Sequence, residues 1–476
     1  MKILLANKFY RPGGGPETGM RLVVKDLEVL GHTVIPFSMH DPRNYATEYE
    51  KYFVSNIDYE NHSRLPWDLA KSALKIIYNV EARKKIEQLI IDTKPDIAHM
   101  RNIYHQLSPS ILLPLKRHNI PVVMTLHDFK MLCPNYTFMR NKKPCEECQG
   151  KYFYKAIKYK CVKNSYLKST LCALEMYIHK KARTYIDAVD CFIALSRFTQ
   201  GKMIEYGLPK EKIFYLPNYI NIPDFTPKRQ KEKYVLFLGM LSDKNGSYNL
   251  TCAMRSLPEI KLKIAGVGPQ RSLIENYIRE NNMKNVELLG FLTGERLQEV
   301  TANCTFLAFP NNCYHNCPMS ILEAFSYGKP VIGARLGSVP ECIEDGKNGL
   351  LFQPGNVEDL ARKIRYLYER PKLVRMLGQD GLEKVKRNYS KENHYERLLG
   401  LYQDLVEKKK IGNHAYTQTN INISNNKPSS RVLIANCVSG VAPDTTNKEK
   451  VSADLRIIKE EHLSRKSCKT LTVSLD

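Results

Sequence analysis

The chain has 476 residues, of which 43% are hydrophobic and 25% are charged, as in a globular protein that forms two domain cores. No apolar stretch is long enough to cross a bilayer, and the apolar run after Lys2 is too short for a signal peptide, so we expect a cytoplasmic protein. The formal net charge of +23 indicates an anionic partner, but no RNA-binding signature or recognition helix is present. We therefore expect no nucleic acid, and an acidic glycan or peripheral contact with the anionic inner membrane instead.

Short apolar runs alternate with amphipathic segments over most of the chain, which predicts an α/β fold with parallel sheets. In the first half, strands are expected at 2–6, 33–38, 96–100, 121–126, 191–195 and 213–216. In the second half, they are expected at 234–239, 261–265, 286–289, 304–309, 330–334 and 349–352. Helices are expected at 357–369, 372–388 and 391–409.

The polar segment 217–233 separates the two sets of strands, which predicts two Rossmann-like domains, 1–217 and 218–390, that face a cleft. A final helix at 391–410 follows them. Residues 411–476 begin with a stretch rich in Asn and Thr and contain few apolar clusters, so we expect this tail to be mostly disordered.

The stretch from Asn316 to Glu341 is the most informative part of the chain. A loop follows the strand that ends at Pro310, and a helix is expected to begin near Pro318 and to end near Gly328. Such a helix directs its free backbone N–H groups into the crevice at the carboxyl ends of the strands, where α/β folds bind phosphates. A Glu one and a half turns into the helix, Glu323, can accept hydrogen bonds from sugar hydroxyls.

This helix, the Gly-Lys-Pro-Val-Ile strand and the Gly-x-x-Pro-Glu turn resemble the nucleotide-sugar site of retaining glycosyltransferases of the GT-B fold, carbohydrate-active family four (glycosyl transferases group 1). The resemblance covers about residues 1–405 and implies the GT-B fold, with the last helix crossing back to the first domain. It implies that the donor is bound by Asn316, Pro318, Met319, Ser320, Ile321 and Glu323.

Three consecutive glycines, 13–15, follow the first strand, and such a turn lets backbone amides approach a phosphate or simply connects a strand to a helix. The turn resembles the Gly-Gly-x-Glu loop of the family, with Gly14, Gly15 and Glu17 in the matching positions. The resemblance implies that this loop contacts the donor diphosphate and helps to form the acceptor pocket.

The strand at 121–126 ends in His127-Asp128. A His at this end of a strand faces the cleft more often than the core, where it hydrogen-bonds a sugar hydroxyl or stabilises developing charge. The alternative is a structural His with Asp128 as its partner. Because His-Asp matches the family motif, we favour a catalytic pair that positions the donor sugar and the acceptor.

The chain departs from the family in the loop that begins at Gly239. The family places an Arg and a Lys beside the donor diphosphate there, whereas this chain has Met240 and Asn245 at those positions. Lys244, one residue early, is expected to supply the positive charge.

Two further sites complete the expected cleft. Gly266 and Gly268 resemble the family's loop near the nucleotide base, although a simple turn explains them equally well. His315 stands where the family has the first of two Glu residues, so the resemblance implies that ribose recognition by Glu323 is kept, that sugar recognition is altered, and that His315 is a catalytic candidate.

An insert at 133–168 contains Cys133, Cys145, Cys148 and Cys161. Four Cys, two of them in a CxxC pair, are able to hold a structural zinc ion, and four unrelated thiols are the equal alternative. Residues 140–168 also hold nine basic and two acidic residues interleaved with tyrosines. This composition suits a surface for lipid headgroups or for the acceptor, or else a merely solvated face.

We therefore expect a retaining enzyme that needs no cofactor for its chemistry and moves a hexosyl unit from a nucleotide diphosphate sugar to a surface glycan or a lipid-linked acceptor. The alternative is a weakened or inactive homologue that acts as a binding or assembly subunit, which the departures at Met240, Asn245 and His315 would explain. Another GT-B enzyme, such as a phosphorylase or an epimerase, is a further alternative, although it would need motifs that the chain lacks.

Overall fold

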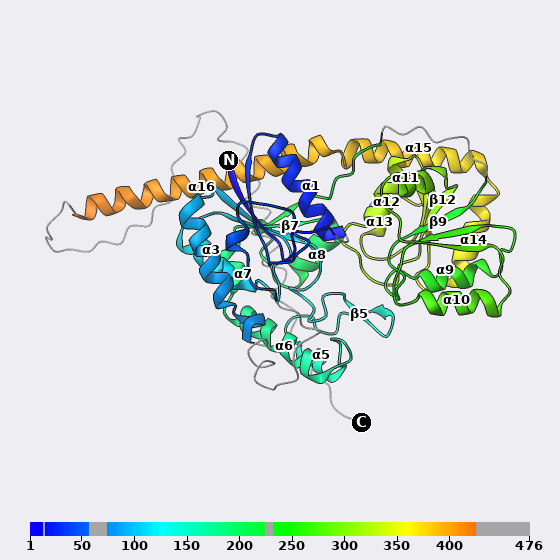
Figure 1. The fold of residues 1–476 in the computed structure, drawn as a ribbon, viewed down its shortest axis with the longest axis horizontal. Helices are drawn as coiled ribbons and strands as arrows, with labels where there is room; N and C mark the ends of the chain where they lie inside the picture. The colour runs from blue at the N-terminus through cyan, green and yellow to red at the C-terminus, as the bar shows by residue number, and fades with distance from the viewer. Residues whose placement is uncertain (13–14, 57–73, 224–231, 425–476) are drawn as a thin grey trace, which may run out of the picture. The chain divides into compact units, whose positions relative to one another are not determined.

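The computed structural model describes residues 1–12, 15–56, 74–223 and 232–424, and of 15–18 and 412–424 it describes the backbone alone. Residues Met1–Tyr416 form one compact unit. This unit contains two six-stranded sheets, and Figure 1 shows each sheet with helices packed on it. This arrangement confirms the predicted α/β fold with two Rossmann-like halves.

The first sheet has the strand order β2-β1-β3-β4-β7-β8, and all its neighbouring strands run parallel. Its strands are β1 (Lys2–Ala6), β2 (Thr33–Phe37), β3 (Ile97–Met100), β4 (Val122–Leu126), β7 (Cys191–Ala194) and β8 (Ile213–Tyr215). The chain winds to one side of β1 to form β2 and to the other side to form β3. The switch point therefore lies between β1 and β3, where open α/β sheets bind their ligands.

The second sheet has the order β11-β10-β9-β12-β13-β14 and is also parallel. Its strands are β9 (Val235–Leu238), β10 (Leu262–Ala265), β11 (Val286–Gly290), β12 (Phe306–Phe309), β13 (Val331–Ala334) and β14 (Gly349–Phe352). This is the Rossmann order, with its switch point between β9 and β12. All the predicted strands are present, because strands buried on both faces form continuous apolar runs that the sequence reveals.

The helices of the first half cover both faces of its sheet. They are α1 (Gly15–Val29), α3 (Val80–Thr93), α4 (Leu112–Arg117), α5 (Tyr154–Lys158), α6 (Tyr166–Lys181), α7 (Thr184–Ala188) and α8 (Arg197–Glu205). A short antiparallel hairpin, β5 (Met139–Arg140) and β6 (Lys143–Pro144), belongs to the insert.

The helices of the second half follow the same pattern. They are α9 (Ser247–Met254), α10 (Arg271–Glu280), α11 (Gly294–Asn303), α12 (Met319–Ser326), α13 (Val339–Cys342), α14 (Val357–Tyr368) and α15 (Pro371–Asn388). In the part of the chain that the structure describes, no helix has the length and apolar character needed to cross a membrane.

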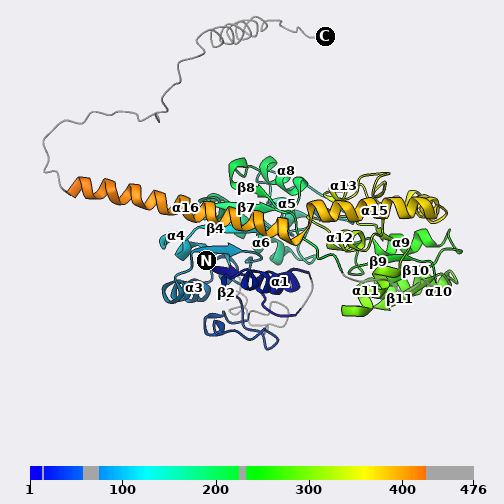
Figure 2. The ribbon, with the colours of Figure 1, turned by 90° about the horizontal axis from the view of Figure 1, so that it is seen from above.

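The last helix, α16 (Lys391–Ser424), returns to the first sheet, as predicted. Its Tyr395, Leu398 and Tyr402 pack into the same buried cluster as α1 and β1, and Figure 2 shows α15 on the second half and α16 along the first. The Tyr402 hydroxyl lies 2.6 Å from Nδ1 of His99 on β3. The helix extends beyond the predicted end at 410, because adding a residue to an existing helix costs little even where the composition is polar.

Candidate functional site

The two halves are joined at the carboxyl ends of their strands by buried polar contacts. The Asn316 side chain, in the loop before α12, donates from Nδ2 to the carbonyl oxygen of Leu126 at 3.0 Å and accepts from Thr199 Oγ1 at 2.7 Å. The Glu341 carboxylate accepts the backbone N–H of Phe198 at 2.6 Å at the start of α8. These contacts hold the end of β4 opposite the loop that leads into α12.

His127 and Asp128 follow β4 at this junction. The His127 side chain is half-buried and its Nε2 has no hydrogen-bond partner among the described residues. Burial first, and the positive charge of Arg101 second, hold the pKa of His127 well below its usual range, so the imidazole is neutral. Asp128 accepts the backbone N–H of Lys130 at 2.9 Å, and burial raises the pKa of its carboxyl. A ligand hydroxyl that reaches the buried Nε2 of His127 would satisfy its hydrogen-bonding capacity.

Helix α12 begins directly after Pro318, as the sequence predicts, so the free N–H groups of its first turn lie at the carboxyl end of β12. Met319 and Ser320 are half-exposed there, whereas the Ile321 side chain is fully buried in the core. Ile321 can therefore contact a donor through its backbone alone.

Glu323, on the same helix, is half-exposed, and its carboxylate makes no hydrogen bond to the described residues. Burial raises the pKa of this carboxyl. A partly desolvated carboxylate without donors to satisfy it suits the recognition of paired hydroxyl groups.

The glycines of the second half are required by backbone packing. A Cβ on Gly266 would lie 1.8 Å from the carbonyl oxygen of Gly239, and one on Gly268 would lie 2.4 Å from that of Leu241. Both glycines therefore fix the loop after β9 against the loop after β10. This packing explains Gly266 and Gly268 without a donor, so their predicted contact with the donor stays a prediction.

The loop after β9 is braced by Asn245, whose Nδ2 donates to the carbonyl oxygen of Met240 at 2.9 Å. Met240 itself is 61% exposed. The two residues that replace the expected Arg and Lys thus bond to each other. Lys244 lies over the ring of Tyr136 in the insert at 5.2 Å.

His315 lies close to Lys244 and contacts Cys313, with 3.7 Å between Nε2 and Sγ. Burial and the charge of Lys244 lower the pKa of His315 to about 4, so the ring is neutral near pH 7. His315 can therefore exchange hydrogen bonds with a sugar but cannot serve as a cation beside a diphosphate.

The predicted glycine-rich loop lies largely outside the described residues. Gly14 falls in the undescribed segment, and nothing is described of the Glu17 side chain. Gly15 is the first residue of α1. Their predicted contacts with the donor remain predictions.

The four insert cysteines line one small cavity, together with residues such as Asn135, Ala156 and Tyr159. All four are free thiols, and Cys133 Sγ donates to Asn135 Oδ1 at 3.0 Å. Across the described ranges, no group of three or more His, Cys, Asp or Glu side chains has the arrangement of a metal site. The zinc expectation is therefore unsupported, because sequence spacing shows that thiols can gather but not whether they converge on one point.

The insert nevertheless contacts the site. Glu146, inside the CxxC pair, accepts the Tyr314 hydroxyl at 2.8 Å, and its other oxygen pairs with Lys202 of α8 at 2.7 Å. Tyr314 precedes His315, so the insert supports the loop that carries this candidate. Sequence reasoning missed Glu146, Thr199 and Arg101, since no motif marks them; Arg101, however, directly follows β3 at the predicted cleft edge.

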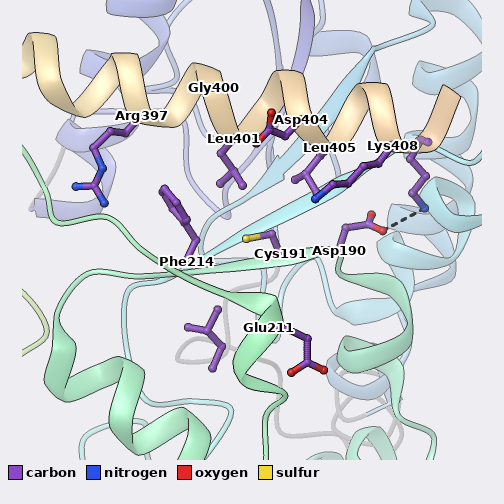
Figure 3. A pocket seen from close by; sticks show the side chains of 12 residues that line it. Asp190, Cys191, Glu211, Phe214, Arg397, Gly400, Leu401, Asp404, Leu405 and Lys408 are labelled. Carbon is purple, nitrogen blue, oxygen red and sulfur yellow. Dashed lines mark ion pairs between the residues drawn. The ribbon is translucent and has the colours of Figure 1, made fainter. Parts of the chain in front are cut away.

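A cavity with a volume of about 760 Å³ lies elsewhere. It is lined by α16 and the beginnings of β7 and β8, as Figure 3 shows. The Lys409–Asp190 ion pair, 3.2 Å long, closes one side. This cavity contains none of the predicted site residues and lies at the amino ends of the strands.

Comparisons with known proteins agree with the fold. The family model described as Glycosyltransferase Family 4 matches residues 13–222, and the model described as Glycosyl transferases group 1 matches residues 219–384. An uncharacterized glycosyltransferase of Methanocaldococcus jannaschii is 24% identical over 86% of this chain and 99% of its own. A poly(ribitol-phosphate) alpha-N-acetylglucosaminyltransferase of Staphylococcus aureus is 28% identical over 40% of each chain.

Among solved structures, Anabaena HepE in complex with UDP and glucose has a TM-score of 0.60 and 17% identity over 85% of this chain and all of its own. The two family models meet at the junction between the sheets and together span both halves of the cleft. The chain therefore belongs to the glycosyltransferases of the GT-B fold, the family four and group 1 enzymes that use nucleotide-sugar donors.

Proposed function

We propose that the protein transfers a hexosyl unit, with retention, from a nucleotide diphosphate sugar to a hydroxyl of a growing surface glycan or a lipid-linked acceptor. The observation that carries the proposal is the Asn316–Leu126 hydrogen bond, which places His127 of the first half opposite the start of α12 in the second. A donor held between them has its diphosphate at a helix N-terminus and its sugar beside an unpartnered imidazole.

Each residue of the cleft has a role that follows from its chemistry. Glu323 accepts hydrogen bonds from the ribose hydroxyls, while the first-turn N–H groups of α12 and the Lys244 ammonium stabilise the departing diphosphate. Neutral His127 exchanges a hydrogen bond with the donor sugar and aligns it with the acceptor hydroxyl. No step requires a metal ion or another cofactor. The inactive-homologue alternative is not favoured by the family matches.

A polymer as acceptor is supported by the S. aureus relative, which by its name acts on poly(ribitol-phosphate). The insert offers a surface for an anionic polymer or membrane, since Tyr152, Tyr154 and Tyr166 are exposed beside Lys151 and Lys158. Exposed tyrosines among lysines suit the headgroup region of an anionic bilayer. We therefore include in the proposal peripheral contact with the inner face of the membrane.

The test begins with thermal stabilisation by a panel of nucleoside diphosphates, followed by turnover assays with the sugars of the nucleotide that binds. NMR of the product then reports whether the anomeric configuration is retained. Sedimentation with anionic and with neutral vesicles tests the membrane contact. A protein that binds a nucleoside diphosphate but neither transfers nor hydrolyses any nucleotide sugar would refute the proposed activity.

A further inference from the structure

Arg101 is a buried cation without a visible counter-ion. It directly follows β3, its side chain is 8% exposed, and its buried Nε has no hydrogen-bond partner among the described residues. Among the described residues, its titratable neighbours that can become anionic are three tyrosines, Tyr395, Tyr402 and Tyr219, rather than a carboxylate. A buried guanidinium without an anion is costly, so such a position calls for an anionic partner.

The acid on the same side of the sheet is already engaged. Asp26 of α1 forms an ion pair with Lys391 and accepts the hydroxyls of Tyr219 and Tyr395. Burial raises the pKa of both tyrosines, so their hydroxyls stay neutral and bring no negative charge to Arg101. Within the described part of this layer, the positive charge therefore remains uncompensated.

The guanidinium points toward the beginning of α1. Nη2 of Arg101 lies 3.4 Å from the position that a Cβ would take on Gly19, one turn into α1, which is van der Waals contact. The backbone N–H of Arg101 also donates to Ala6, the last residue of β1, at 2.9 Å. The cation and the first turn of the 15-residue helix α1 thus lie together at the switch point between β1 and β3.

The same edge of the sheet holds His127, whose Nε2 is likewise buried and without a partner. Two unsatisfied groups with hydrogen-bonding capacity and a helix N-terminus are the components of a phosphate site. All of these groups lie within the described residues.

We propose that Arg101 binds a phosphate group in the cleft and is the anion-binding side chain of the first half. The inference rests on the proposed function, in which the phosphate belongs to the donor diphosphate or to a phosphorylated acceptor. Either source presents the same oxygens to the guanidinium. Arg101 then supplies, from the first half, the positive charge that Met240 and Asn245 do not supply from the second.

The test compares Arg101→Met with wild type, using inorganic pyrophosphate as the probe in calorimetry and thermal unfolding. Because the variant removes a buried charge without a partner, the ligand-free protein should be as stable as wild type or more stable. Its affinity for pyrophosphate should fall about 10- to 100-fold, the value of one charge-assisted hydrogen bond. The pyrophosphate affinity of Arg101→Lys should lie between those of wild type and Arg101→Met.

Arg21→Met is the matched control, since Arg21 lies on α1 and has partners, donating to the Tyr10 hydroxyl at 2.9 Å and stacking on Tyr45. This control should lose stability and keep pyrophosphate affinity. Weaker binding of a nucleoside diphosphate, but not of the nucleoside, in Arg101→Met identifies the donor as the source of the phosphate. Unchanged nucleotide binding with a raised KM for a phosphorylated acceptor identifies the acceptor.

The proposal is overturned if Arg101→Met is destabilised while its pyrophosphate and nucleotide affinities and its acceptor KM stay at wild-type values. It is also overturned if Glu17→Gln and Arg101→Met cause equal, non-additive losses of stability, because an internal carboxylate would then be the partner. Failure of the proposed function has a different signature. In that case no nucleotide sugar is turned over, although pyrophosphate binding still depends on Arg101.

Discussion

The amide of Asn316 bonds to the carbonyl oxygen of Leu126, the residue that precedes His127, across the junction of the two halves. The Asn316 Oδ1 accepts a hydrogen bond from the Thr199 hydroxyl, so both the nitrogen and the oxygen of this amide are engaged. Family resemblance implied that Asn316 contacts the donor, whereas its observed bonds set the position of the cleft walls. The relation between β4 and α12 therefore depends on this buried amide.

Asn316→Ala should leave the Leu126 carbonyl and the Thr199 hydroxyl unpaired, at a cost of about 1–3 kcal/mol for each buried group. Turnover should fall by about 100-fold, because a shift of about 1 Å between the reacting groups has that effect. Chemical unfolding and steady-state kinetics measure the two changes. Thr199→Val, which removes one of the two bonds, should show roughly half the loss of stability. Full stability with weakened nucleotide binding would instead assign Asn316 to the donor.

Glu323→Gln should stabilise the ligand-free protein near neutral pH and weaken its binding of nucleotides. Burial raises the pKa of Glu323 above its ordinary value, so the folded protein releases this proton at a higher pH than the unfolded chain does. Ionisation is therefore unfavourable in the folded state, and wild-type stability falls as pH rises through the folded-state pKa. The gain in stability of Glu323→Gln over wild type should reach its full size above the folded-state pKa and vanish below the unfolded-state pKa.

Thermal unfolding of both proteins between pH 4 and pH 8 measures this difference, and nucleotide titrations supply the second reading. Because the carboxylate accepts hydroxyl hydrogen bonds, wild-type nucleotide affinity should decline as pH falls through the raised pKa, while the weaker affinity of the variant stays flat. A pH-independent difference in stability would mean that Glu323 is well solvated.

The strands and the position of the cleft follow from the sequence, because parallel strands buried on both faces are apolar runs and their carboxyl ends converge. His127 and the start of α12 were located in this way. Other relations depend on contacts between distant segments. Nothing local indicates that Asn245 braces Met240, that Asn316 bonds to Leu126, or that Arg101 is buried without a counter-ion among the described residues. Sequence spacing likewise brought the four cysteines together without determining their geometry.

His127→Ala should reduce kcat by about 100-fold, and His127→Asn, which keeps one hydrogen-bond donor, should reduce it less. Burial first, and the charge of Arg101 second, lower the pKa of His127, so the ring is neutral throughout the usual assay range. Titration of His127 should therefore contribute no transition to the pH profile of wild-type kcat between pH 6 and pH 8. The profiles of wild type and His127→Asn should have the same shape. A transition near pH 6.5 that disappears in this variant would show that the ring titrates normally.

Lys244→Ala should lower kcat by about 100-fold or more while changing donor affinity far less, because negative charge on the diphosphate builds up in the transition state. Lys244→Arg should keep much of the activity. The control is Lys142→Ala, since Lys142 pairs with the adjacent Asp243 at 3.1 Å and should have little effect. His315→Gln should also be mild, because the pKa of His315 is about 4 and both side chains are neutral.

Adding back the family residues should separate two effects: Met240→Arg adds a cation at an exposed position, whereas Asn245→Lys removes the bond to the Met240 carbonyl and loosens the loop. Met240→Arg should therefore raise the turnover of the Lys244→Ala variant, and Asn245→Lys should lower the stability of the protein. If Lys244→Ala retains wild-type kcat, the positive charge opposite α12 comes from another residue, and combining it with Arg101→Met tests whether that residue is Arg101.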